Sequence, residues 1–409
     1  MNQFARSESE KQFAHAGPLC LIMASWRDFL RNASAGAETQ FDQLKNHLFK
    51  RLDARKSYRI VYYRGFGSPT AVWLKGRVLR QPDLDAATYN APGDRDTFWQ
   101  NILATYRRFN SHEVPGITVR VEAFGQAYTT VTDDEGYFDL TINPPNDLTP
   151  GRAWFPVRYS LDGIVQPNPN DSGENQPVVK DGYLMISPPF SQFGVISDID
   201  DTVLVTDATN LLQTAKLTFL GNAYTRLPFA GIAAFYRALQ SGPVTTLFNP
   251  IYFVSSSPWN LYDLLVDFFR IQGIPKGPIL LRDLSFSPKL LSAEGHHTHK
   301  LAMIQKVLDV NPQLPFVLIG DSGQQDPEIY AQVVRENPGR IRAIYIRDVS
   351  EDRRDEAVRE LIRITDADHV PMLLVPDTVA AAEHAASLGL IDPDTIPEIR
   401  ADRRADEEN

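Results

Sequence analysis

Cysteine is almost absent from this sequence, and so are long apolar runs. Cys20 is the one cysteine among 409 residues, so the chain cannot close an internal disulfide. Because its neighbours are apolar, we interpret Cys20 as a buried thiol in a reducing compartment. The longest apolar run, residues 18–24, is far short of the roughly 20 residues that span a bilayer, and no secretory signal pattern precedes it. We therefore expect a cytoplasmic protein.

An excess of positive charge is also missing. The 41 Lys and Arg residues stand against 51 Asp and Glu residues, which gives a net charge of -10. This charge opposes general adhesion to nucleic acid or to an anionic bilayer, so we expect no nucleic-acid partner. A peripheral membrane contact would need a local basic patch, for which residues 45–64 are one candidate, although a solvated amphipathic face is the favoured interpretation. The sequence identifies no protein partner.

The length of the chain predicts about two or three domains, because a single core rarely grows this large. Residues 1–57 form an N-terminal segment with two helix-like stretches, 19–31 and 39–52. Residues 58–190 are instead rich in short runs of β-branched and aromatic residues, whose regular spacing predicts a β-sandwich. These runs cover residues 58–63, 72–79, 117–124, 128–132, 137–142, 153–159 and 183–186. Among them, residues 132–138 resemble the acidic turn and following strand of transthyretin-like sandwich modules.

The second half of the chain has a different pattern. From Phe193 onward, short apolar runs alternate with segments of helical spacing, and such alternation predicts a parallel sheet covered by helices on both faces. The predicted strands are 193–196, 251–255, 279–281, 316–319, 341–346 and 372–375, and the predicted helices are 258–271, 298–308, 327–336 and 351–364. We therefore expect an α/β domain over residues 191–391, with an insertion at 203–250, followed by an acidic flexible tail over residues 392–409.

Two carboxylates and a hydroxyl follow the first of these strands, in Asp198, Asp200 and Thr202. The carboxyl ends of parallel strands are where an open α/β sheet usually binds its ligands. A pair of carboxylates there can hold a cation, supply a nucleophile and move a proton, and the alternation of side chains separates Asp201 from the other two. A solvated acidic turn is the alternative interpretation, since two nearby aspartates often occur by chance.

Three further groups stand at strand ends or helix starts in the same half. Ser255 and Ser256 stand at the end of the second strand, where hydroxyls and free N–H groups suit a phosphate oxygen, although helix capping accounts for them equally well. Lys300 begins a helix and would bring an ammonium group to the same edge, with a solvated lysine as the alternative. Asp321 and Asp326 form a second acidic site after the fourth strand. Because these loops offer oxygen ligands, the expected metal is Mg²⁺.

The order of these parts over residues 193–375 resembles the haloacid dehalogenase superfamily of phosphatases. Five longer sequence motifs show a narrower resemblance to the phosphatidate phosphatase family typified by a fungal actin-patch enzyme. They are SDIDDT at 197–202, VSSSPWNL at 254–261, HK at 299–300, GDSGQQDPEIY at 320–330 and IYIRDV at 344–349. The resemblance implies a Rossmann-like parallel sheet of haloacid dehalogenase-like type behind the β-sandwich and the N-terminal helices. It also makes the insertion at 203–250 a small cap over the pocket.

The resemblance also implies a role for each residue at a matching position. Asp198 would attack phosphorus to give an aspartyl-phosphate. Asp200 would protonate the leaving oxygen and later deprotonate the attacking water, and Thr202 would orient Asp200. Ser255, with its neighbour Ser256, and the ammonium group of the lysine would hold the phosphoryl group.

The same resemblance implies a metal site and a function. Asp198, Asp200 and Asp321 would ligate Mg²⁺, and Asp326 would be either a further ligand or the residue that orients Lys300. The implied function is Mg²⁺-dependent hydrolysis of a phosphomonoester, a lipid phosphate such as phosphatidate in first place. A soluble phosphate ester, a phosphoprotein, and a non-catalytic adaptor that binds lipid or protein through the sandwich are the alternatives. The intact acidic motif and lysine argue against a non-catalytic adaptor, since a site that no longer catalyses a reaction would be free to lose these residues.

Overall fold

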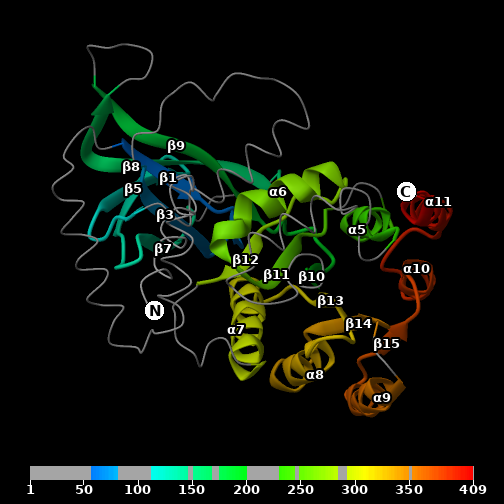
Figure 1. Cartoon of the computed structure of the whole chain (residues 1–409). Coiled ribbons are helices and arrows are strands. Elements are labelled where there is room, and N and C mark those ends of the chain that lie inside the picture. Colours follow the sequence, from blue (N-terminus) through cyan, green and yellow to red (C-terminus); the bar gives the residue numbers. More distant parts are fainter. Residues whose placement is uncertain are drawn as a thin grey trace, which may run out of the picture. The chain divides into compact units, whose positions relative to one another are not determined.

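Two β-sheets organise the part of the chain that the structure describes (Figure 1). This computed structural model describes residues 57–81, 112–145, 151–167, 175–199, 230–244, 248–283, 293–349 and 352–408. All of these residues belong to one compact unit. The helices expected at 19–31 and 39–52 lie outside the described residues, as does most of the insertion expected at 203–250, and the division into domains stays a prediction.

In the described residues, nine strands form the first sheet, which we call the front sheet. They are β1 (Ser57–Tyr62), β2 (Gly65–Gly67), β3 (Val72–Gln81), β4 (His112–Glu113), β5 (Thr118–Ala123), β6 (Gln126–Val131), β7 (Tyr137–Ile142), β8 (Trp154–Pro167) and β9 (Asn175–Ile186). Their order is β1-β3-β2-β9-β8-β5-β6, and β4 and β7 both pair with β3. The pairs are antiparallel except for β2 with β9, which is parallel.

Strand β2 joins what would otherwise be two separate sheets. It pairs with β3 on one side and with β9 on the other, although it consists of Gly65, Phe66 and Gly67 alone. Both glycines are needed here. A Cβ on Gly65 would lie 2.4 Å from Cδ2 of Leu74, and one on Gly67 would lie 2.2 Å from the carbonyl oxygen of Ala71. Close approach of neighbouring chains is a common reason for glycine within a strand.

The predicted fold class is therefore wrong. We expected an α/β chain with a Rossmann-like, haloacid dehalogenase-like sheet behind a β-sandwich with N-terminal helices. The described residues instead hold a nine-stranded mixed sheet and a six-stranded parallel sheet, which is a β-rich mixed class. The spacing of short strands does not say how the strands pair. A Gly-Phe-Gly strand has little β propensity, so the sequence pattern did not reveal the link that merges two sheets into one.

Among the same described residues, six strands form the second sheet, which we call the parallel sheet. They are β10 (Gly194–Asp198), β11 (Ile251–Pro258), β12 (Ile279–Arg282), β13 (Phe316–Asp321), β14 (Ile341–Arg347) and β15 (Met372–Val375). Their order is β12-β11-β10-β13-β14-β15, and every pair is parallel. After β12 the chain crosses back to place β13 on the other side of β10. The carboxyl ends of β10 and β13 thus flank the point where the strand order reverses, which is where open parallel sheets bind ligands.

Helices connect the strands of the parallel sheet, and α10 and α11 follow its last strand, β15. They are α5 (Ile232–Ser241), α6 (Tyr262–Ile271), α7 (Ala293–Val310), α8 (Asp326–Glu336), α9 (Asp352–Ala367), α10 (Thr378–Ser387) and α11 (Ile396–Glu408), with 3-10 helices at Trp259–Leu261 and Pro393–Thr395. Helix α7 packs on β11, and α8 packs on β13 and β14. In Figure 1, α7, α8 and α9 follow one another along one side of this sheet. Within the described ranges, every helix is too short or too polar to cross a membrane.

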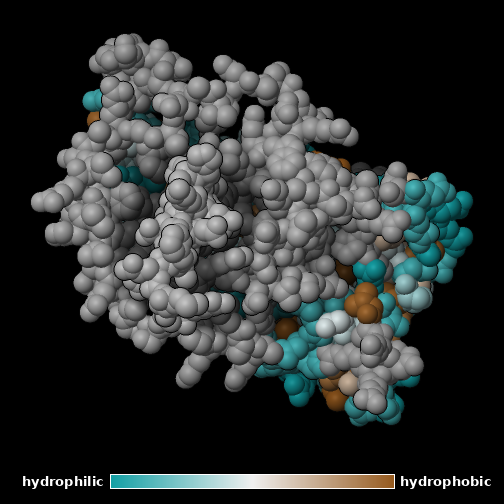
Figure 2. All heavy atoms as spheres, in the orientation of Figure 1, coloured by the Kyte–Doolittle hydropathy of each residue, from teal (hydrophilic) through white to brown (hydrophobic). Residues whose placement is uncertain are grey.

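The end of the chain forms a helix where we expected a flexible acidic tail. Helix α11 packs against α5 and α10. Asp402 accepts a hydrogen bond from the backbone N–H of Ala234 at 3.0 Å, and Asp406 accepts one from that of Gly231 at 2.7 Å. These N–H groups begin α5, where the helix dipole favours negative charge. The surface around α11 is mostly hydrophilic (Figure 2). Acidic residues therefore cap a distant helix, a role that composition alone does not reveal.

Strand β3 takes part in two hydrophobic cores. Leu74 lies in the core enclosed by the front sheet, whereas Trp73 and Leu79 lie in the larger core that includes the parallel sheet. Successive side chains of a strand point to opposite faces. Lys75 and Arg77, which stand between Trp73 and Leu79, therefore face the parallel sheet, and both are buried.

Candidate active site

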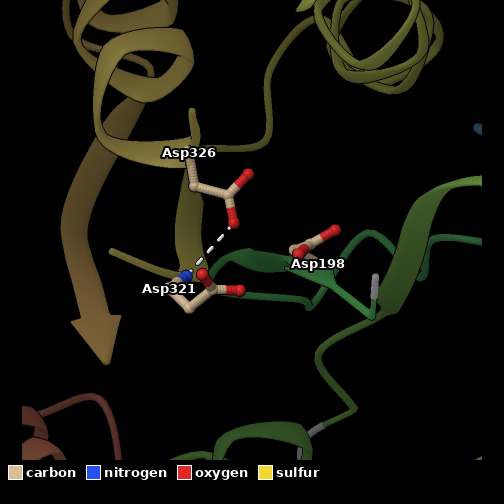
Figure 3. A group of neighbouring side chains, drawn as sticks. All are labelled: Asp198, Asp321 and Asp326. Carbon is tan, nitrogen blue, oxygen red and sulfur yellow. Dashed lines mark hydrogen bonds between the residues drawn. The ribbon is translucent and has the colours of Figure 1, made fainter. Parts of the chain in front are cut away.

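Two aspartates end adjacent strands of the parallel sheet. Asp198 is the last residue of β10 and Asp321 is the last residue of β13, and the two strands pair in parallel up to Ser197 and Ile319. Their side chains therefore reach the same sheet edge. Asp326, the first residue of α8, completes a group of three carboxylates that each bring one oxygen within 4.8 Å of the others. Figure 3 shows the three around one space, and we call them the acidic cluster.

Asp326 is fully buried and held from two sides. Its Oδ1 accepts a hydrogen bond from Nζ of Lys300 at 2.6 Å, and its Oδ2 accepts one from the backbone N–H of Asp321 at 3.1 Å, the dashed line in Figure 3. Gly320 leaves room for this carboxylate, because a Cβ there would lie 2.3 Å from Oδ2 of Asp326. Since both oxygens already accept hydrogen bonds, the geometry favours Asp326 as the residue that orients the lysine.

Lys300 places a buried ammonium group beside the acidic cluster. Its Nζ lies 2.9 Å from Oδ1 of Asp198 and 2.6 Å from Oδ1 of Asp326, and 3% of its side chain is exposed. Burying a charge is costly unless it is paired, and here two carboxylates pair with it. The interpretation of Lys300 as a solvated lysine is therefore excluded. Three carboxylates against one ammonium group leave an excess of negative charge, which attracts a cation.

The loop after β13 fixes the carboxylate of Asp321. Its Oδ1 accepts hydrogen bonds from the backbone N–H groups of Gly323 at 2.8 Å and Gln324 at 3.1 Å. Nearby, the hydroxyl of Tyr330 donates to the carbonyl oxygen of Ile319 at 2.8 Å. Burial, and then the negative charge of the acidic cluster, raises the pKa of Tyr330 well above its ordinary value, so this hydroxyl remains a donor. The second acidic site is thus a structured loop.

The serines predicted to bind phosphate lie in a bulge of β11, residues Ser255–Ser257, which we call the serine bulge. Val254 pairs with Leu280 of β12, whereas Pro258 pairs with Arg282, so β11 carries extra residues between these two pairs. Bulges of this kind often re-aim side chains next to active sites. Inside the bulge, Ser255 is fully buried, and its Oγ accepts a hydrogen bond from the backbone N–H of Ser257 at 2.9 Å. The phosphate-binding role of Ser255 and Ser256 stays a prediction.

Two predicted site residues, Asp200 and Thr202, lie outside the described residues, so their roles stay predictions. Sequence reasoning missed one residue that steadies this motif from within the described part. Tyr236 of α5 has its hydroxyl 2.6 Å from Oγ of Ser197, directly before Asp198. Burial raises the pKa of Tyr236, so its hydroxyl stays protonated. The sequence gives no signal for Tyr236, because its partner Ser197 lies on another element, β10.

Two buried cations of the front sheet were also missed. Nζ of Lys75 donates to Oδ2 of Asp283, the residue after β12, at 3.3 Å. Nη1 of Arg77 donates to Oδ1 of Asn260, which follows the serine bulge closely, at 3.0 Å. The available signal was the interruption of an apolar strand by two cations. It indicated buried partners but did not identify them.

A comparison with protein families confirms the resemblance to the phosphatidate phosphatase family. Residues 193–348 match the family model described as "Phosphatidate phosphatase APP1, catalytic domain". The matched stretch contains the acidic cluster, Lys300 and the serine bulge.

Two curated yeast proteins are similar to this chain. Phosphatidate phosphatase APP1 of Saccharomyces cerevisiae is 26% identical over 285 residues, which are 66% of this chain and 46% of that protein. An uncharacterised protein of Schizosaccharomyces pombe is 27% identical over 228 residues, 55% of this chain and 35% of that protein. The chain thus spans less than half the length of these relatives. Among solved structures, a carbohydrate acetylesterase from Xanthomonas citri matches with 11% identity over 76% of this chain and 74% of that one, at a TM-score of 0.23, which is too low to carry an argument.

Proposed function

Residues 193–348 make this chain a member of the phosphatidate phosphatase family, and from that membership we propose that it hydrolyses a phosphomonoester, with phosphatidate as the first candidate substrate. The observation that carries the proposal is the buried contact of Lys300 with Asp198 and Asp326 at the edge of the parallel sheet. Phosphoryl transfer needs a positioned nucleophile and positive charge around the transferred group. A carboxylate and an ammonium group held together at a strand end supply both.

Asp198 is the proposed nucleophile. One of its carboxylate oxygens attacks phosphorus, the bond from phosphorus to the leaving oxygen breaks, and the electron pair departs with that oxygen. Asp200 gives the departing oxygen its proton, and Thr202 orients Asp200. Water then attacks the phosphorus of the aspartyl-phosphate while Asp200 takes a proton from it. Phosphate leaves, and the carboxylate of Asp198 is restored.

Lys300 and the serine bulge have binding roles in this proposal. The ammonium group of Lys300 neutralises charge on the equatorial oxygens of the phosphoryl group, and Asp326 keeps the ammonium group in place. The hydroxyls of Ser255 and Ser256 hold the phosphoryl oxygens during both steps. Because these groups are buried, they act where water screens charge weakly, which strengthens their effect on the transition state.

The acidic cluster fits Mg²⁺. Its donors are carboxylate oxygens gathered within 4.8 Å, and hard oxygen donors with an excess of negative charge are what Mg²⁺ prefers. We assign the ion to Asp198 and Asp321, with Asp200 as a further ligand. When bound, Mg²⁺ offsets the negative charge of the nucleophile and of the phosphoryl oxygens. We assign Asp326 to Lys300 instead, since both of its oxygens already accept hydrogen bonds.

Release of inorganic phosphate tests both the reaction and the substrate class. The purified chain is incubated with phosphatidate in mixed micelles, with a panel of soluble phosphomonoesters and with a phosphopeptide, each with Mg²⁺ and with a chelator. We expect release that requires Mg²⁺ and is fastest from phosphatidate. Faster release from a soluble ester or from the phosphopeptide would assign the protein to that substrate class. No release from any substrate would contradict the proposal.

A further inference from the structure

We propose that the front sheet contributes to the active site. In this proposal Arg77 is a positioning residue that fixes the serine bulge through Asn260. The inference rests on the phosphatase function proposed above. The family match begins at residue 193, after the front sheet, and therefore assigns no role to that sheet. The contacts between the two sheets supply one.

The serine bulge is anchored differently at its two ends. At the near end, Val254 pairs with Asp198 of β10 on one side and with Leu280 of β12 on the other. At the far end, Pro258 pairs with Arg282 of β12. Proline has no N–H and cannot donate to a strand ladder, so the backbone restrains the far end less than the near end. Side-chain contacts must supply the missing restraint.

Strand β3 of the front sheet and the short segment between β1 and β2 provide side-chain contacts directly after Pro258. The ring of Tyr63 stacks on the ring of Trp259, with centroids 4.1 Å apart and an angle of 28° between the ring planes. Next to it, Nη1 of Arg77 donates to Oδ1 of Asn260 at 3.0 Å. Trp259 is thus held by the segment between β1 and β2, and Asn260 is held by β3 of the front sheet.

Arg77 can act as a rigid anchor because its other contacts fix its orientation. Its Nε donates to the carbonyl oxygen of Glu135 at 2.9 Å, its Nη2 lies 3.4 Å from Oε1 of Glu113, and its Cζ lies 4.4 Å from the ring centroid of Tyr137. The side chain is 8% exposed. A guanidinium group is planar, so fixing some of its N–H donors also fixes the direction of the others. In Arg77 the remaining donor, Nη1, points to Asn260.

A shift of Asn260 would be transmitted to the phosphate-binding hydroxyls. Asn260 is separated from Ser257 by Pro258 and Trp259 alone, and the N–H of Ser257 holds Oγ of Ser255 at 2.9 Å. Misplacement of a binding group by about 1 Å can lower a rate by about 10²-fold. The guanidinium group therefore contributes to phosphoryl transfer although it touches no substrate.

A double-mutant cycle tests this inference. The variants are Arg77→Met, Asn260→Leu and their combination, assayed with a chromogenic aryl phosphate and with inorganic phosphate as competitive inhibitor. We expect each single variant to lower kcat/KM by about tenfold or more and to weaken inhibition by phosphate to a similar degree. The combined variant should have a kcat/KM no lower than that of the less active single variant. Both changes break the same contact, that of Arg77 with Asn260. A role in stability alone would leave phosphate inhibition of the folded fraction unchanged.

Arg158→Met is the matched control. Arg158 also lies in the front sheet and pairs with an aspartate, Asp181 at 2.7 Å, but its side chain is 58% exposed and that pair lies within the front sheet. We expect wild-type kinetics from it. Wild-type kcat/KM and phosphate inhibition in Asn260→Leu, or losses in the single variants that multiply in the combined one, would overturn the inference. If Arg77→Met does not fold, Asn260→Leu alone decides the outcome.

Asp198→Asn, assayed beside these variants, separates this inference from the proposed function. An inactive wild-type protein refutes the phosphatase function and with it the inference, whereas an active Asp198→Asn refutes only the assignment of Asp198 as the nucleophile. An active wild-type protein and an inactive Asp198→Asn, together with fully active Arg77→Met and Asn260→Leu, refute the role of Arg77 alone.

Discussion

Replacing Gly320 with alanine should disable the acidic cluster although it removes none of its charged groups. The added Cβ would lie 2.3 Å from Oδ2 of Asp326 and 2.8 Å from its Cβ and Cγ. Contacts under 3.0 Å are not sustained. Asp326 must therefore move by at least about 0.7 Å, and by about 1 Å to reach an ordinary contact, because β13 itself is packed in the core.

Two effects follow from that movement. Overpacking a core position lowers the free energy of unfolding by about 1–3 kcal/mol. The movement also breaks the 2.6 Å contact of Asp326 with Lys300 and the 3.1 Å contact with the N–H of Asp321, so the ammonium group loses its orienter. Because a misplacement of about 1 Å can lower a rate by about 10²-fold, we expect kcat to fall by that factor.

Phosphate release and denaturant unfolding, measured on the same preparations, check both effects. Gly151→Ala is the control, because a Cβ on Gly151 would meet nothing within 4 Å, and we expect it to behave as wild type. Gly320→Ala with wild-type kcat would refute the reasoning, whether or not the variant is less stable. Activity would then not depend on the position of Asp326.

Two further predictions concern one helix of the site and one distant histidine. Lys300→Met should lower kcat by about 10²–10³-fold, because it removes the ammonium group from the phosphoryl oxygens, whereas Lys306→Met on the same helix should not; equal phosphate release by the two variants would refute this. Burial lowers the pKa of His384 below 6.5, so the unfolded chain binds more protons than the native chain around that pH. This contribution to stability is present above pH 6.5 and is lost as the pH falls through the native pKa. His384→Asn should therefore weaken the decrease in the free energy of unfolding on acidification, as measured by urea unfolding, and an unchanged decrease would count against it.

The residues of the acidic cluster could be located from the sequence, and their contacts could not. Asp198 and Asp321 end apolar runs, and parallel strands bring such ends to one edge of a sheet. The expectation that Lys300 begins a helix is wrong, because Lys300 is the eighth residue of α7 (Ala293–Val310). Its burial and its two carboxylate partners depend on the packing of α7 against the sheet. The bond from the N–H of Asp321 to Asp326 depends on the path of one loop and on the missing side chain of Gly320. The spacing of residues in a sequence shows neither the packing of a helix on a sheet nor the path of a loop.

The arrangement of the front sheet was harder to predict, for two physical reasons. Strand β2 is three residues long and contains two glycines, so neither propensity nor alternation marks it, yet it joins the two parts of the sheet. Arg77 and Asn260 are 183 residues apart in the chain. A contact over such a distance depends on tertiary packing, and a cation within an apolar strand indicates only that some partner exists.

The initial rate of phosphate release from phosphatidate micelles by Asp198→Asn tests the central claim most directly. Asparagine has nearly the same shape as aspartate and keeps an oxygen for Lys300, but its amide is a poor nucleophile. We predict that turnover falls by about 10³-fold or more while the thermal unfolding transition remains that of a folded protein. Turnover close to that of the wild type, in a folded preparation, would contradict the assignment of Asp198 as the nucleophile.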